Sequence, residues 1–169
     1  MLCPVQLAEG ELHRLPAGEV MEHVALQEVC AFPEQDIPHL EQILFEDEIV
    51  ARDWAIMDFP IDRILPAALL EQDFCLPGQT AAEAAHARRC VRAEIRIAGG
   101  IDAHVAKDLP VILDIKDGFV QPLAGAHLCA IAAREHGRKT IRAAVGYDPE
   151  LGHWLREALR DDQMIPDIF

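Results

Sequence analysis

Residues 125–128 carry the residue types best suited to binding an anion. They are Gly125, Ala126, His127 and Leu128, and they stand between an expected strand and an expected helix. The first N–H groups of a helix have no partner within it, and together with the positive end of the helix dipole they favour phosphate or carboxylate. Glycine allows the backbone to approach a ligand closely, and histidine can hydrogen-bond a phosphate or exchange a proton near neutral pH. We therefore expect these four residues, called the elbow below, to bind a negatively charged group.

Each of these features also has an explanation that involves no ligand. A sharp turn from strand to helix needs a glycine whether or not a ligand is bound. The side chain of His127 could instead cap the helix or pack against the body of the protein. Cys129 is either a thiol activated by the helix dipole or an inert buried cysteine. The sequence leaves these alternatives open.

Three strands and one helix are expected to position the elbow. Asp117-Gly118 lies between two apolar runs, a pattern that favours a tight antiparallel hairpin. After the hairpin the apolar residues take helical spacing, and Gly137 marks the end of that helix. Together these elements form a core motif over residues 110–145. The motif comprises strands at 110–115, 119–123 and 140–145 and a helix from 128 to 136.

The order of these elements resembles that of the ParB/sulfiredoxin superfamily, which includes chromosome-partition CTPases, sulfiredoxins and free-serine kinases. The resemblance implies an α+β fold with a small mixed sheet flanked by helices. It also implies a nucleotide or phosphorylated ligand on the N–H groups of the elbow, with ATP, ADP or CTP and Mg²⁺ as cofactors. The activity implied is a small-molecule phosphotransferase or nucleotide hydrolase. The matching residues are Pro110, Val111, Ile112, Gly118, the segment 124–128, Ala130, Ala132, Ala133, Gly137, Lys139, Thr140 and Ile141.

The chain also departs from the superfamily pattern at the elbow. Ala124 stands where relatives carry Asp, Leu128 stands where they carry the phosphate-binding Arg, and Ala126 occupies the place of the sulfiredoxin cysteine. The resemblance implies charge stabilisation by His127 and a carboxylate such as Glu22 as the catalytic base, with Glu22-His23 and Glu28 both resembling in position the element that carries it. Because a leucine cannot replace the two-pronged contact of an arginine with phosphate, a second hypothesis stands beside the first. It describes a catalytically inactive module that acts as a ligand sensor or a protein-protein interaction domain.

Composition limits the classes of protein to which the chain can belong. Its 169 residues are 51% hydrophobic, which suits one domain over 1–169 with a substantial core. The formal charge of −14 repels nucleic acid, and the sequence shows no apolar run that spans a membrane and no signal peptide. Five scattered cysteines and eight histidines form no metal-binding motif, so no metal site is expected. We expect a cytoplasmic protein whose partner is a small molecule or nucleotide.

The rest of the chain gives expectations of unequal strength. Thr80 and Glu83 form a capping box ahead of an Ala-rich helix ending near Cys90, and the alternation over 91–97 predicts a strand. Pro66 is expected to start, kink or divide a helix. Further expected elements are a hairpin of strands 5–7 and 11–15, a helix capped by Asp36 that ends near 46–48, a strand at 54–57, and a C-terminal helix at 149–160. That last helix and the tail after it are the candidate surface for a homo-oligomer.

Overall fold

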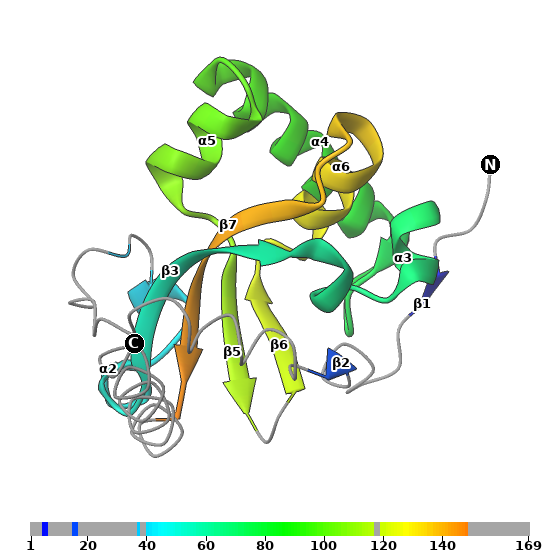
Figure 1. Ribbon diagram of the computed structural model, residues 1–169. Helices are drawn as coiled ribbons and strands as arrows, with labels where there is room; N and C mark the ends of the chain where they lie inside the picture. The colour runs from blue at the N-terminus through cyan, green and yellow to red at the C-terminus, as the bar shows by residue number, and fades with distance from the viewer. Residues whose placement is uncertain (1–4, 7–14, 17–36, 38–39, 117–118, 149–169) are drawn as a thin grey trace, which may run out of the picture.

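The protein has an α+β fold in which helices pack on a five-stranded mixed sheet (Figure 1). A computed structural model describes residues 5–6, 15–16, 37, 40–116 and 119–148. The strands are β1 (Val5–Gln6), β2 (Leu15–Pro16), β3 (Asp53–Pro60), β4 (Phe74–Cys75), β5 (Ile112–Lys116), β6 (Phe119–Ala124) and β7 (Thr140–Tyr147). The helices are α2 (Glu46–Val50), α3 (Ala67–Glu71), α4 (Ala81–Ala98), α5 (Ile101–Asp108) and α6 (Ala126–His136), with 3₁₀ turns η3 (Leu40–Gln42) and η4 (Ile61–Arg63).

The core motif has the predicted order. β5 and β6 pair as an antiparallel hairpin, and α6 then crosses over so that β7 lies parallel to β5. Helix α6 ends at Gly137, whose φ of 62° lies in the left-handed region that is common just after the last residue of a helix. On its other edge β7 pairs antiparallel with β3 along eight residues. The sheet therefore has the order β2-β6-β5-β7-β3, and the predicted hairpin, helix and third strand are confirmed.

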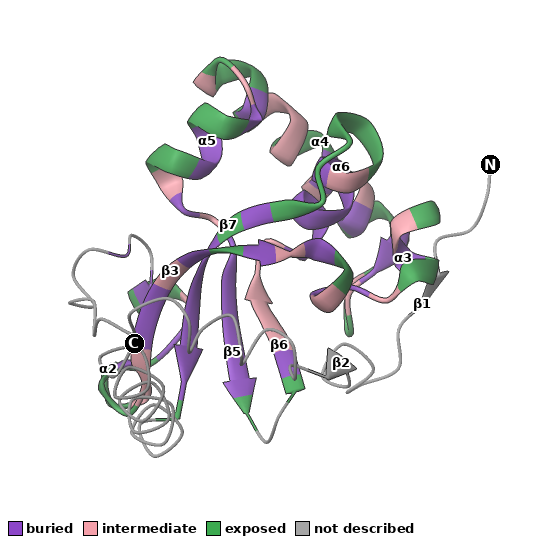
Figure 2. Ribbon diagram, in the orientation of Figure 1, coloured by how far each residue is buried: buried purple, intermediate pink, exposed green. Residues whose placement is uncertain are grey.

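Two apolar clusters lie on opposite faces of the sheet. Alternation along β3 sends Met57 and Phe59 into the larger cluster, which also contains residues of α3, α4, α5 and α6. Trp54 belongs to the smaller cluster with Ile49 of α2, and its indole N–H donates to the carbonyl oxygen of Ile49 at 3.0 Å. Figure 2 shows that β5, between these clusters, is buried along most of its length. Both faces of the sheet centre are thus covered by protein.

Helix α4 confirms the capping box and corrects the predicted strand at 91–97. The hydroxyl of Thr80 accepts from the N–H of Glu83, and the side chain of Glu83 accepts from the N–H of Thr80. The helix continues to Ala98 and ends at Gly99, whose φ is 92°. Apolar residues at 91 and 95 fit an alternating pattern and a helical one equally well, since four residues is a multiple of two and about one helical turn. The segment forms a helix rather than a strand because both residues then face the larger cluster.

Two other predictions are wrong. The long helix expected after Asp36 is replaced by η3 and a separate α2, so the acidic run 46–48 occupies a first turn, where the helix dipole favours it. The expected N-terminal hairpin does not form within the described residues, because β1 pairs with β4 and β2 pairs with β6. Pro66 divides η4 from α3, as expected. Glu22, the helix at 149–160 and the tail lie outside the described residues.

Among the helices of the described segments, none has both the length and the apolar character that crossing a membrane requires.

Candidate functional site

Gly125 joins β6 to α6, and the fold itself requires a glycine there. Its φ of 86° lies in the left-handed region, which side chains with a Cβ rarely adopt. A Cβ at this position would also lie 2.9 Å from the carbonyl oxygen of Pro110 and 3.0 Å from the Cα of Val111. The close approach is therefore to the protein's own backbone at the start of β5.

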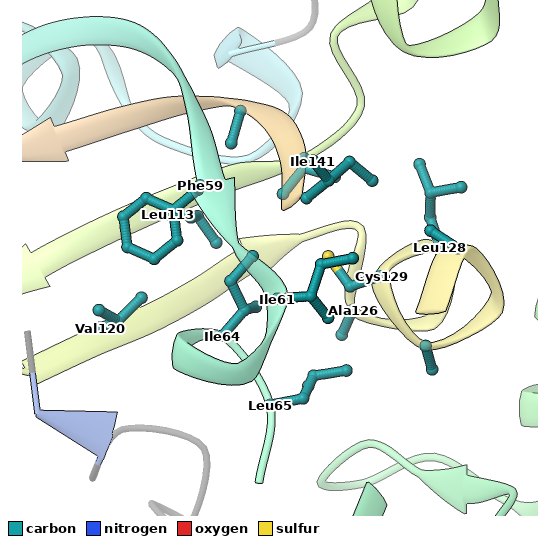
Figure 3. Close-up of a cluster of buried hydrophobic side chains, with 14 of the residues drawn as sticks. Phe59, Ile61, Ile64, Leu65, Leu113, Val120, Ala126, Leu128, Cys129 and Ile141 are labelled. Carbon is teal, nitrogen blue, oxygen red and sulfur yellow. The ribbon is translucent and has the colours of Figure 1, made fainter. Parts of the chain in front are cut away.

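The amides of the elbow point out of the first turn of α6 into a closed environment. The N–H of Cys129 donates to the carbonyl oxygen of Gly125 at 3.0 Å, and it is the first amide of the turn with a partner among the described residues. Ala126 and His127 are each 5% exposed, and Leu128 is 2% exposed. Figure 3 shows Ala126, Leu128 and Cys129 within the large apolar cluster, in which Ile61 and Ile64 of the η4 region also lie. The turn has free donors, but protein covers it.

His127 is held by residues that precede it by about fifty positions. Its ring stacks on Phe74 of β4, with centroids 4.8 Å apart, and its Nε2 lies 3.0 Å from Oε1 of Gln79. The same oxygen accepts the N–H of Leu76, so it is the amide oxygen, and Nε2 must carry the proton it donates. The buried Nδ1 of His127 has no hydrogen-bond partner among the described residues. The segment 74–79 thus closes over the elbow.

The charge state of His127 follows from this environment. Its pKa is lowered to about 4, chiefly by burial and also by the positive charge of Arg88, while Asp73 opposes the shift. The ring is therefore neutral at neutral pH. A neutral histidine stabilises the negative charge of a phosphate far less than a cation would, so the role that the resemblance implied for His127 loses its electrostatic basis.

Ionic contacts between α4, α6 and the start of β4 surround this histidine. Arg88, only 8% exposed, donates to the carbonyl oxygen of Phe74 at 3.2 Å and lies 3.5 Å from Asp73. Asp73 also accepts a hydrogen bond from Arg134 of α6 at 3.0 Å. This buried arginine was not predicted from the sequence. The available signal was its spacing from Ala84 and Ile95, which places it on the buried side of α4.

The open question about Cys129 is also answered by its surroundings. Its side chain is fully buried, and burial raises the pKa of the thiol to about 12. A thiol in that state is neither nucleophilic nor redox-active at neutral pH. The inert alternative is the one that the geometry supports.

Two hollows lie in the described segments, and neither of them adjoins the elbow. One lies between α5 and β7, and the other lies beside Asp114, which forms a bidentate pair with Arg52. None of the elbow residues lines either of them. Within the described residues no group of three His, Cys, Asp or Glu side chains could hold a metal ion. The described residues therefore bring His127 together with Gln79, Phe74 and Arg88, but with no carboxylate positioned as a base.

Acidification should destabilise the fold through His127. Its folded-state pKa of about 4 lies below the ordinary 6.5, so the unfolded chain binds the proton first as the pH falls. The free energy of unfolding should thus decrease between those two values, by on the order of 3 kcal/mol, and this group should have no effect at higher pH. Urea unfolding at about pH 7 and about pH 4.5 measures the loss, which His127→Gln should largely remove because glutamine can still donate to Gln79.

A matched control for this substitution lies at the other end of the same helix. His136 is exposed, so His136→Gln should keep the acid-induced loss of the unmodified protein. Equal losses in both variants would show that the proton taken up on unfolding belongs to another group.

Comparison with known proteins gives no independent assignment. No protein-family model, no curated protein and no solved structure matches the chain.

Proposed function

We propose that the chain is a non-catalytic, ligand-binding module on a ParB/sulfiredoxin-like scaffold. The order hairpin, glycine-containing elbow, helix and third strand, with β5 parallel to β7, supports this scaffold. The resemblance in residues 110–141 supports it as well. The function follows the second hypothesis, in which the scaffold is kept and the active motif is lost.

The main support for a loss of catalysis is that protein covers the elbow. His127 is buried, stacked on Phe74, hydrogen-bonded to Gln79 and neutral at neutral pH. Leu128, at the place of the phosphate-binding arginine, contributes to the core. A phosphoryl group there would meet neither a cation nor water-filled space, whereas phosphoryl transfer depends on charge stabilisation and positioning.

A specific observation favours a second candidate, a nucleotide-binding elbow that opens. The Nδ1 of His127 is buried without a partner among the described residues, and such a group is costly to leave unsatisfied. If Phe74 and Gln79 moved away, the ring proton would be free to move from Nε2 to this nitrogen. It would then face an incoming phosphate as a donor, together with the first amides of α6. Arg88, whose positive charge already lowers the pKa of His127, would then be a cation close to that phosphate.

Thermal unfolding with ATP, ADP and CTP, each with Mg²⁺, separates the two candidates. A ligand that binds the native state raises the melting temperature, and the rise grows with the logarithm of ligand concentration above the Kd. We expect no change with any of the three nucleotides and no release of phosphate from ATP or CTP. Gln79→Ala should also give no response, although it removes the bond that holds His127.

The opposite result would have a distinct pattern. A rise in melting temperature that His127→Ala abolishes, together with phosphate release, would establish the opening elbow and reject the non-catalytic proposal. A rise in the Gln79→Ala variant alone would show that the segment 74–79 is a removable cover.

A further inference from the structure

A cavity of about 290 Å³ lies between α5 and β7, on the side of α6 that faces away from Gln79 and β4. It opens where α5 passes over the first residues of β7. Its walls come from four elements: α5, the C-terminal half of α6 with the turn after it, and the neighbouring strands β3 and β7. Nothing in the core motif of the sequence pointed to it, because α5 precedes residue 110, where that motif begins.

The inner wall of this cavity is apolar. Ile101 and Val105 of α5 face Ala132 of α6 and Ile141 of β7 across it. These four side chains are at most 6% exposed, so they are fixed parts of the packed core. Because these side chains are so little exposed, the apolar surface that they offer is small, and it suits a ligand with a short hydrocarbon body, whose burial removes it from water.

The mouth of the cavity carries two arginines. Arg138 donates to Asp102 at 2.9 Å, while the Nη1 of Arg142 lies 3.6 Å from Asp58, which is an ion pair without a hydrogen bond. The two guanidinium groups are about half exposed. Each guanidinium has five N–H donors in a planar fork that matches a carboxylate, and most of these donors have no partner among the described residues.

The two aspartates at the mouth restrict the charge of the ligand. Asp58 and Asp102 are more exposed than the arginines, and both stand at the entrance. The chain as a whole carries a formal charge of −14. A polyanion such as a nucleotide triphosphate would be repelled by this field, whereas a single carboxylate can pair with the guanidinium groups at little cost.

We propose that this cavity binds a small organic monocarboxylate, with its hydrocarbon body against Ile101, Val105 and Ile141 and its carboxylate on Arg142 and Arg138. This inference rests on the proposed ligand-binding function and names the class of ligand. The hydroxyl of Thr140, which also lines the cavity, is a further donor for the second carboxylate oxygen.

The test measures binding by ¹H–¹⁵N NMR titration of the full chain. The probe is pentanoate, and the uncharged pentanamide is its matched control. Pentanoate should shift the amide signals of residues 101–106 and 138–142 in a saturable manner. Pentanamide should bind about tenfold more weakly, since it loses a charge-assisted hydrogen-bond pair. Arg142→Gln should weaken pentanoate binding by a similar factor and leave pentanamide binding unchanged.

Two further variants complete the design. Arg89→Gln removes an exposed arginine of α4 that does not line the cavity, and it should bind pentanoate like the unmodified chain. Ala106→Phe places a ring in the cavity from an exposed position on α5, and it should abolish binding of both probes.

Three results would overturn the inference: no saturable shift with pentanoate, shifts confined to other residues, or equal binding by Arg142→Gln. None of these results bears on catalysis at the elbow, which the nucleotide experiment measures separately. A nucleotide hydrolysed at the elbow would reject the proposed function and leave the cavity result standing.

Discussion

Replacing Gly125 with alanine should lower the free energy of unfolding by about 3 kcal/mol or more, because two independent costs add at this position. The φ of 86° is unfavourable for any residue with a Cβ, and the added Cβ would lie 2.9 Å from the carbonyl oxygen of Pro110. That oxygen belongs to the backbone at the start of β5, so it cannot move without disturbing the centre of the sheet. Urea unfolding of both proteins measures the loss.

Gly137, at the other end of α6, supplies the matched control. Its φ of 62° is also in the left-handed region, but an added Cβ there would meet no atom within 4 Å. Gly137→Ala should therefore show the conformational cost alone, about 1 to 2 kcal/mol. Equal losses at the two glycines would mean that the contact with Pro110 and Val111 contributes nothing, and would reopen the interpretation of Gly125 as a residue that admits a ligand.

The core motif was predictable because its signals are local. Asp117-Gly118 sets the hairpin, helical spacing sets α6, and Gly137 ends it, each within a few residues. The parallel pairing of β5 with β7 then follows from the length of chain that α6 supplies. The sequence of this region contains nearly all the information that its topology requires.

The environment of the elbow was not predictable in the same way. Its cover comes from Phe74 and Gln79, which lie about fifty residues before His127 and belong to no pattern that includes it. A helix N-terminus looks the same in the sequence whether solvent or protein lies in front of it. The pKa of His127 depends on that difference, so the expected acid-base role could be judged once tertiary contacts were known.

The errors in secondary structure have a related cause. Residues 91–97 alternate in polarity, and the choice between strand and helix depended on whether 91 and 95 could share one buried side. The turn at Phe45 was missed because phenylalanine is an unusual helix cap. Here its extended backbone and the side chain of Glu48, which accepts from the N–H of Phe45 at 3.1 Å, start α2. Neither case could be decided from propensity alone.

Leu128→Arg, which introduces the arginine of the superfamily that the elbow resembles, should be the most damaging single change at the elbow. Leu128 is 2% exposed and lies in the large apolar cluster with Ile61 and Ile141, so the guanidinium would be buried without a carboxylate to pair with it. A buried charge left unpaired costs several kcal/mol, and we expect a loss of about 4 kcal/mol or more, which is most of the stability of a domain at the lower end of the usual range of about 5 to 15 kcal/mol. Circular dichroism and urea unfolding of the purified variant measure this loss.

Leu128→Met is the matched control, because it keeps the volume and the apolar character of the side chain and should cost less than about 1.5 kcal/mol. A Leu128→Arg protein that folds with near-normal stability and gains a melting-temperature response to ATP would contradict the buried position of this side chain. Position 128 would then reach solvent beside the amides of α6, and the elbow would be a phosphate site from which one substitution had removed the cation. Loss of folding in the arginine variant with normal folding in the methionine variant would instead show that the core requires an apolar side chain at position 128. It would also show that this substitution alone does not create a phosphate-binding contact at the elbow.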